Sequence, residues 1–437
     1  MTLAANVSAA DPLGKKTGAI VFLAFAAAYF CSALVRAITA TLSPVLTQEF
    51  SLQARDLGLL AGGYFLGFAA TQLPLGAWLD RHGPKRVILY FLSLAVLGCL
   101  AFSLAGSFAW LLAARVLVGM GVSACLMAPL TGYRRWFEPS AVLRANSWML
   151  MTGSLGMLAS TLPVQWLMPL TGWRPLFWIL AALILLSMAA IVWVVPVWQV
   201  GERAAERSEG PPRASSAPLR GERGSAAHEV ASVGAYSLIW RSRYFRKMSP
   251  LAFFNYGGMV AMQTLWAGPW MVKVVGYTPL EAATGLFYIN ASMLATFWGW
   301  GMVNPWLAQR GWSANRLISW GVPLSLAVLA FNILAGAATG WLGWALFCMS
   351  SSAMGLAQPA VGMAFQPALA GRALSAYNLV IFAGVFVVQW SIGLLIDAFA
   401  AMGLGQVASF QAAMTLFLCC GIASYGYFLS VKADNSP

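Results

Sequence analysis

Apolar runs of about 20 residues recur along the whole chain, and each is long enough to cross a bilayer as an α-helix. With 60% of its residues hydrophobic and only 9% charged, the chain has far more apolar side chains than the core of a soluble domain needs. The sequence therefore predicts an all-α polytopic membrane protein. Twelve transmembrane helices are expected at residues 19–47, 55–78, 87–106, 109–131, 144–168, 174–197, 249–274, 280–303, 315–337, 341–363, 373–397 and 406–431.

The positions of the basic residues predict which side of the membrane each loop faces. With the amino terminus inside, 21 of the 26 Lys and Arg residues fall on inside segments and three fall outside. Without the nine in the long middle loop, the ratio is still 12 to three. Because cytoplasmic loops accumulate Lys and Arg, we expect a multi-pass protein of the cell inner (plasma) membrane with both termini in the cytoplasm.

The same pattern argues against several other classes of protein. The formal charge of +13 could indicate nucleic-acid binding, but the basic residues lie in short stretches between apolar runs, which membrane topology explains better. The six cysteines lie inside apolar runs without CxxC spacing, so neither a disulfide framework nor a metal site is indicated. No cluster of His, Cys or acidic residues falls in the membrane to serve as nucleophile, base or metal ligand. We therefore expect that the protein is not an enzyme, that it uses no cofactor or metal, and that it does not bind nucleic acid.

A long polar connection divides the chain into two parts. Residues 200–244 are rich in Glu, Arg, Ser, Pro and Gly and contain no sustained apolar run, which is typical of a flexible linker. The end of this stretch, residues 238–247, mixes aromatic and basic residues, as a short interfacial helix or the flank of the next span would. The predicted domains are a six-helix bundle at residues 1–197, a cytoplasmic linker at 198–248 and a second six-helix bundle at 249–437.

The two halves also repeat in sequence. A shift of 227 residues places Arg36 on Gln263, and a shift of 228 residues places Gly83 on Gly311. A six-plus-six duplication implies a pseudo-two-fold axis along the membrane normal. The substrate site of such a protein lies between the halves, near the middle of the membrane.

The loop after the second predicted span carries a motif of glycine and charged residues. Glycine permits the tight turn, and the basic cluster favours the cytoplasmic face. The stretch resembles the signature loop of the major facilitator superfamily of transporters, G-x-x-x-D-R-x-G-x-[KR]-[KR]. With twelve spans, a long middle loop and a half-chain repeat, the resemblance covers the whole chain. The motif residues are Gly76, Asp80, Arg81, Gly83, Lys85 and Arg86.

The resemblance implies gating and coupling roles for two charged residues. Asp80 looks like the acid that docks at the start of the eleventh helix, near Gly371 and Arg372, and latches the inner gate. Residues 111–121 resemble the fourth-helix pattern L-x-x-x-R-x-x-x-G-x-G, whose arginine, here Arg115, faces the cavity and is associated with proton coupling in the family. The alternative is an Arg115 that snorkels near the outer interface.

Arg36 is a charged residue inside the first apolar run. It lies 20 residues after Lys16 and 13 before Glu49, within a turn or two of mid-membrane. A guanidinium there costs roughly 2.5 to 3.5 kcal/mol and is a functional-site hypothesis by default. The spacing to Pro44 is similar to that in the first helix of organophosphate antiporters and organic anion:cation symporters, in which the arginine binds the anionic substrate. Because the repeat partner Gln263 is neutral, one guanidinium and one amide suit a monoanionic or partly aromatic solute better than a dianion.

No carboxylate is expected at the centre of the membrane. All thirteen acidic residues fall in loops, in tails or at span ends, and both histidines fall in cytoplasmic segments. Water, backbone carbonyls or a substrate anion must then balance Arg36, so a structural arginine bonded to carbonyls is the alternative to an anion site. Three coupling routes stay open: protonation of the substrate, titration of an edge acid such as Glu49 or Asp397, or a uniporter or exchanger.

Polar and aromatic residues on the pore-lining spans of this fold are the other candidates for the site. Buried amides often only join helices, and aromatic residues often only pack. Tyr29 and Gln263 rank highest, because helical position and repeat symmetry place them with Arg36. The predicted substrate site comprises Arg36, Gln263, Tyr29, Tyr256, Trp266, Asn378 and Gln389. Further candidates are Tyr64, Gln72, Asn255, Asn290, Gln358 and Trp390.

The features together predict a monomeric transporter that imports a small organic anion, a carboxylate or vitamin-like metabolite, by alternating access. Proton symport is the expected coupling. Proton-driven exporters of the family carry G-x-x-x-G-P in the fifth helix, and Met157 stands where that proline belongs, which makes export the less favoured direction. Proton-coupled export is the first alternative. A transporter-like nutrient sensor is the second, with residues 200–244 as its only candidate output segment.

Overall fold

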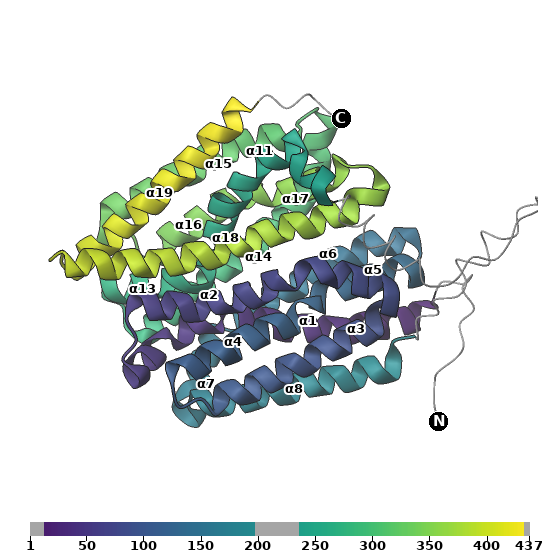
Figure 1. Cartoon of the computed structure of the whole chain (residues 1–437), viewed down its shortest axis with the longest axis horizontal. Helices are drawn as coiled ribbons and strands as arrows, with labels where there is room; N and C mark the ends of the chain where they lie inside the picture. The colour runs from purple at the N-terminus through teal and green to yellow at the C-terminus, as the bar shows by residue number, and fades with distance from the viewer. Residues whose placement is uncertain (1–12, 197–235, 432–437) are drawn as a thin grey trace, which may run out of the picture.

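The computed structural model describes residues 13–196 and 236–431 of the chain. All regular secondary structure in these ranges is helical, as the apolar runs predict. Figure 1 shows two blocks of helices: the first half of the chain, in purple and blue, lies against the second half, in green and yellow. Most predicted spans match a helix or a run of short helices to within a few residues at either end; the boundary between the second and third spans falls inside one kinked helix, residues 72–103.

The first half accounts for the first six predicted spans. Three of these spans are divided between two helices. The helices are α1 (Lys15–Phe50), α2 (Ala54–Ala70), α3 (Gln72–Ser103), α4 (Phe108–Val122), α5 (Ala124–Trp136), α6 (Pro139–Ala159), α7 (Leu162–Thr171) and α8 (Trp173–Val194).

The second half accounts for the other six predicted spans. The seventh span is a run of α-helical and π-helical turns, and the tenth contains a 3₁₀ segment. The elements are α11 (Arg243–Leu251), η1 (Ala252–Tyr256), α12 (Gly257–Ala261), η2 (Met262–Trp266), α13 (Ala267–Trp270), η3 (Met271–Val275), α14 (Pro279–Gln309), α15 (Ala314–Ala335), η4 (Gly336–Ala338), α16 (Trp341–Ser351), η5 (Ser352–Leu356), α17 (Ala357–Met363), α18 (Pro367–Ala401) and α19 (Gln406–Ser430).

Seven helices of the described residues are individually long and apolar enough to cross a membrane. Four of the other predicted spans are interrupted helices, and the fifth is α14. One interruption has a clear local cause. Pro163 has no backbone N–H to give to Ala159, and α6 ends at that residue before α7 begins.

The two ends of the bundle differ in charge. We call the end that carries the start of α1 and the start of α18 the basic end, because Lys16, Arg86, Arg134 and Arg372 lie there; the other end is called the opposite end. In Figure 1 the basic end is on the right, near α5 and α17, and the opposite end is on the left, near α7 and α13.

Two glycines at the basic end have the same backbone φ in the two halves. Gly83 and Gly311, which the predicted repeat aligns, both adopt a φ of 75°. This left-handed region is open to glycine at little cost. The shared φ is consistent with the repeat, which stays a prediction.

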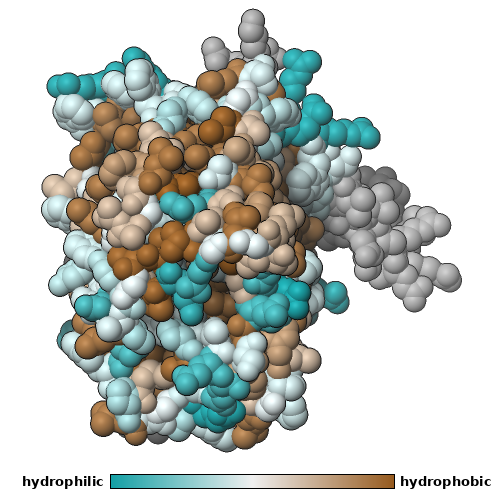
Figure 2. Space-filling view, turned by 90° about the vertical axis from the view of Figure 1, so that its left-hand side faces the viewer, coloured by the Kyte–Doolittle hydropathy of each residue, from teal (hydrophilic) through white to brown (hydrophobic). Residues whose placement is uncertain are grey.

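Helices α2 and α18 form much of the contact between the two halves. Glycines allow their backbones to approach closely: a Cβ on Gly58 would collide with the carbonyl of Gln389, and one on Gly393 would collide with the backbone of Ala54. Further along, the rings of Phe65 and Phe382 stack with centroids 6.2 Å apart. In Figure 2, which looks onto the opposite end, hydrophilic patches lie between hydrophobic residues of the described surface.

The structure shortens the predicted linker at its carboxyl-terminal side. Residues 236–241 are helical, and α11 begins at Arg243, so the helical region starts well before residue 249. Ile239, Phe245 and Met248 are buried in the core of the second half. Their burial explains why this stretch is ordered despite its basic composition. The rest of the predicted linker lies outside the described residues.

Candidate functional site

Arg36 lies in the middle of α1 and is only partly buried. Two turns further on, Pro44 cannot donate to the carbonyl of Ala40, and the hydroxyl of Ser43 donates to that oxygen instead, at 2.8 Å. The helix therefore continues through Pro44 with its free acceptor satisfied. This continuity places Arg36 well inside the span rather than at a helix end.

Aromatic side chains from both halves surround the guanidinium of Arg36. The side chains of Tyr29 and Tyr64 lie beside it, and Tyr256, from the second half, lies close enough to interact with its charge. The ring of Phe68 is 6.0 Å from the guanidinium carbon. The Nε atom of Arg36 is buried and has no hydrogen-bond partner. All these neighbours are uncharged, so the positive charge is solvated without being neutralised.

A second arginine, Arg115 on α4, supports the helix that carries Arg36. Its Nη1 and Nη2 atoms donate to the backbone carbonyls of Val35 and Arg36, at 2.8 and 3.2 Å. The side chain is 1% exposed, and its guanidinium carbon lies 5.0 Å from the centre of the Tyr64 ring. The snorkelling alternative for Arg115 is therefore wrong, because the guanidinium is buried against α1 rather than extended toward an interface.

The same contacts distinguish the roles of the two arginines. Arg115 is the residue bonded to main-chain carbonyls, which was the structural alternative considered for Arg36. No backbone carbonyl of the described residues accepts a hydrogen bond from Arg36. Arg36 therefore keeps donors available for a ligand, whereas Arg115 has used two of its own on α1.

The acidic side chains that the structure describes near the opposite end already have partners. Glu49 pairs with Arg174 at 2.6 Å, Asp56 accepts from the backbone of Gln53, and Glu281 accepts from Thr278. None of these contacts involves Arg36. The described residues also contain no group of three His, Cys, Asp or Glu side chains that could hold a metal ion.

The predicted amides and tryptophan of the second half bond mainly to one another. Gln263 donates to Asn290 at 3.0 Å, and Gln389 donates to the hydroxyl of Thr264 at 3.0 Å. The indole of Trp266 donates to the carbonyl of Gln389 and is fully buried. Trp266 and Gln389 thus contribute to the packing of η2 against α18. No hydrogen bond joins Gln263 to Arg36 in the part of the chain that the structure describes, and both remain candidates for the substrate site.

Each of the remaining amide candidates has a hydrogen-bond partner in the structure. Asn378 accepts from Gln358 at 2.7 Å, which joins α18 to α17; Gln358 is partly exposed, whereas Asn378 is buried. Asn255 donates to Ser424 on α19 at 2.7 Å, and Gln72 donates to a carbonyl of the preceding turn. Asn255 and Gln72 therefore each have a structural hydrogen-bond partner.

The signature motif lies at the basic end, within α3, which is kinked at Gly83 (φ 75°, ψ 162°). The Nζ atom of Lys85 donates to the carbonyls of Val192 and Val195 at the end of α8. Gly76 lies close to α18. A Cβ added to this glycine would be in van der Waals contact with the hydroxyl of Ser375. Arg81 and Arg86 are exposed. The side chain of Asp80 lies outside the described residues, so its docking near Gly371 and Arg372 stays a prediction.

A carboxylate that sequence reasoning did not place in the gate joins the two halves at the opposite end. Asp397, on α18, accepts from the backbone N–H groups of Ala54 and Arg55 at 3.1 and 2.9 Å, and so caps the start of α2 across the interface. The Arg55 side chain is 4.0 Å from the same carboxylate. Both contacts must break if the halves separate at this end. The only sequence signal was the position of Asp397 at a span end.

We expect Asp397→Ala to favour opening at the opposite end. Removing a capping carboxylate costs about 1 kcal/mol, which corresponds to a roughly fivefold shift between closed and open populations. Spin labels at Ser51→Cys and Ala400→Cys would report the distance between α1–α2 and α18. Asp56→Ala is the matched control, because Asp56 caps α2 from within the same half. Equal distance distributions in the wild type and Asp397→Ala would contradict this role.

Comparison with known proteins identifies the family of this arrangement. Residues 25–389 match the family model described as Major Facilitator Superfamily. The chain is 26% identical to the multidrug resistance protein MdtL of Escherichia coli over 378 residues, which cover 82% of this chain and 90% of that protein. It is 28% identical to the 4-hydroxybenzoate transporter PcaK of Pseudomonas aeruginosa over 183 residues, 42% of this chain and 40% of that protein.

Solved structures agree with the fold. A bacterial homologue of the human lysosomal transporter Spinster, in an inward-facing and unoccupied conformation, matches with a TM-score of 0.74 and 17% identity, over 97% of this chain and 100% of that chain. A D-xylose–proton symporter matches with a TM-score of 0.73 and 13% identity, over 95% and 98% of the two chains. Both have the arrangement of helices that the predicted spans and repeat implied.

Proposed function

This chain belongs to the Major Facilitator Superfamily of transporters, and we propose that it imports a small organic monoanion by alternating access, with the anion bound at Arg36. The observation that carries this proposal is that Arg36 is partly exposed, has an unpartnered Nε and lies among tyrosine and phenylalanine side chains. An intramembrane charge without an acidic partner is best stabilised by a ligand of opposite charge.

The surroundings of Arg36 favour an anion that has an apolar or aromatic body. Phe68 packs against Phe382 of the second half with ring centroids 4.3 Å apart, and Phe382 is partly exposed. A carboxylate on Arg36 would therefore place the rest of the solute beside aromatic rings from both halves. The relative named for 4-hydroxybenzoate transport is consistent with such a solute. A dianion would leave a second charge without a described cationic partner at this point.

Alternating access follows from the position of the site between two halves that can part at either end. The contacts of Asp397 with α2 close the opposite end. With the basic end in the cytoplasm, as the distribution of Lys and Arg favours, this closed end faces outward. The described arrangement then corresponds to a carrier that is shut toward the outside. Coupling to protons would run through the substrate or an edge acid.

Transport by the purified protein in proteoliposomes tests the proposal. Thermal-shift screening against aromatic and aliphatic monocarboxylates, dicarboxylates and neutral analogues would first identify a ligand. We expect monocarboxylates with an aromatic ring to stabilise the protein most, and the labelled ligand to enter vesicles whose protein is oriented as in the cell. Stabilisation by dicarboxylates or cations alone would contradict the proposal.

Export is the second candidate function, and the relatives named for multidrug resistance favour it. In that case amphiphilic compounds would bind beside the aromatic residues without needing a negative charge. Vesicle transport in the outward direction, driven by an imposed proton gradient and unaffected by Arg36→Gln, would support export and rule out the anion-import account.

A further inference from the structure

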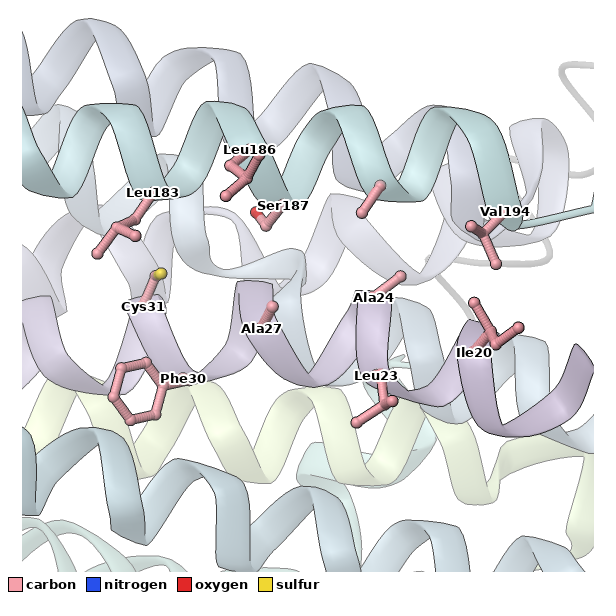
Figure 3. A pocket seen from close by; sticks show the side chains of 11 residues that line it. Ile20, Leu23, Ala24, Ala27, Phe30, Cys31, Leu183, Leu186, Ser187 and Val194 are labelled. Atoms are coloured by element: carbon pink, nitrogen blue, oxygen red, sulfur yellow. The ribbon is translucent and has the colours of Figure 1, made fainter. Parts of the chain in front are cut away.

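A groove of about 400 Å³ lies between α1 and α8, away from the Arg36 site. Figure 3 shows side chains of the two helices on either side of it. Leu23 and Leu186 at its rim are 63% and 68% exposed, so the groove is open to the surroundings of the bundle. We call it the α1–α8 groove, and it is lined by Ile20, Leu23, Ala24, Ala27, Phe30, Cys31, Leu183, Leu186, Ser187, Ala190 and Val194.

Small residues create the groove, and its lining is apolar. Ala24 and Ala27 on α1 lie across from Ser187 on α8 (Figure 3), and Ala190 also lines the space, so neither helix fills it. The one hydroxyl in the lining, on Ser187, already donates to the carbonyl of Ile184 at 2.7 Å. The lining therefore offers shape and hydrophobic contact without a polar partner, which suits a hydrocarbon chain.

The length of the groove matches one leaflet of a bilayer. It extends from Ile20 to Cys31 along α1 and from Leu183 to Val194 along α8. Twelve helical residues, separated by eleven steps of about 1.5 Å, extend about 16 Å, and half of a bilayer's hydrocarbon core is about 15 Å. Val194 is the last residue of α8, so the groove begins at the basic end and reaches about the middle of the membrane.

Positive charge stands at the basic end of the groove. Lys16 is exposed and precedes Ile20 by four residues, so it projects from the same face of α1. Lys85 lies at the other wall, on the carbonyls of Val192 and Val195 at the end of α8. The described ion pairs include neither lysine. A negatively charged group at this level of the membrane would complement both.

We propose that the α1–α8 groove holds an anionic glycerophospholipid of the leaflet at the basic end, with one acyl chain between the helices and the phosphate near Lys16 and Lys85. A chain so placed would hold α1 against α8. Because Arg36 lies on α1 five residues beyond Cys31, the lipid would also steady the helix that carries the substrate site. Lipid binding itself does not depend on Arg36, so it is testable whatever the transported solute is.

Native mass spectrometry of the delipidated full chain, titrated with phosphatidylglycerol or phosphatidylcholine of equal acyl length, tests the proposal. We expect phosphatidylglycerol to bind about fivefold more tightly, the factor that one lysine near an anionic headgroup contributes. Lys16→Gln should bring the two affinities close to each other, whereas Arg241→Gln, in the second half, should leave the ratio unchanged. Ala27→Phe should fill the groove and remove the tight binding of both lipids.

Ala423→Phe is the matched control for the groove-filling variant, because Ala423 is exposed on α19 and lies outside the groove. It should bind lipid like the wild type. Equal affinity of the wild type for the two lipids would overturn the headgroup assignment. If Ala27→Phe and Ala423→Phe bind lipid with equal affinity, the bound lipid is adventitious and does not occupy the groove. If Ala27→Phe does not fold, Lys16→Gln still decides whether an anionic headgroup is recognised.

Discussion

Arg36→Gln is expected to abolish uptake while the protein still folds and inserts. Two charge-assisted hydrogen bonds to a carboxylate contribute about 3 kcal/mol or more, so ligand affinity should fall at least about a hundredfold. Removing a guanidinium that has no acidic partner among the described residues should not lower the melting temperature, because burial of that charge is unfavourable in the absence of ligand. Binding by thermal shift and uptake into proteoliposomes measure the two effects.

Arg36→Lys separates charge from geometry. A lysine keeps the positive charge but lacks the planar fork that binds a carboxylate through two parallel bonds. We expect partial binding and strongly reduced uptake. Arg316→Gln is the control, because that arginine lies over the ring of Trp312 on the loop before α15. Uptake by Arg36→Gln at the level of Arg316→Gln would contradict an anion site at Arg36.

Arg115→Met is expected to slow transport without destabilising the protein. The methionine keeps an apolar stem but loses both hydrogen bonds to the carbonyls of Val35 and Arg36, so the position of Arg36 becomes less defined. Misplacement of a binding group by about 1 Å costs up to about a hundredfold in rate, and we expect a loss of at least about tenfold. The melting temperature should stay the same or rise, because a buried charge without an acidic partner is removed.

Arg174→Met is the control for the loss of an arginine. Arg174 pairs with Glu49 and lies over Trp173 at the opposite end, away from the site. This variant should transport at the wild-type rate with a slightly lower melting temperature. A large drop in stability of Arg115→Met, with turnover unchanged, would show that Arg115 serves only to hold α1 and α4 together.

The extents of most membrane-spanning helices could be predicted from sequence, because hydrophobic length depends on the chain alone. The repeat was also visible, and the matching backbone of Gly83 and Gly311 agrees with it. The place of Arg36 in the middle of α1 followed from its distance to the charged ends of the first span. Among the described residues Arg36 has no acidic partner, as the same counting of acidic residues predicted.

Contacts between helices could not be predicted in the same way, because hydropathy does not fix rotation about a helix axis. From the sequence alone, the side chain of Arg115 could point either toward lipid or into the bundle. Its hydrogen bonds to α1 show that it points into the bundle. The pairing of Gln263 with Asn290 depends on which face of η2 meets α14. The cap that Asp397 provides to α2 depends on the contact between two distant helices, and no local motif indicates it.

Comparison of a carboxylate ligand with its carboxamide tests the central claim most directly. The two compounds have nearly the same shape and differ in charge, so any difference in affinity reports the interaction with Arg36. The wild-type protein should bind the carboxylate at least about a hundredfold more tightly than the amide, and Arg36→Gln should bind the two equally. Equal affinities in the wild-type protein would contradict the account.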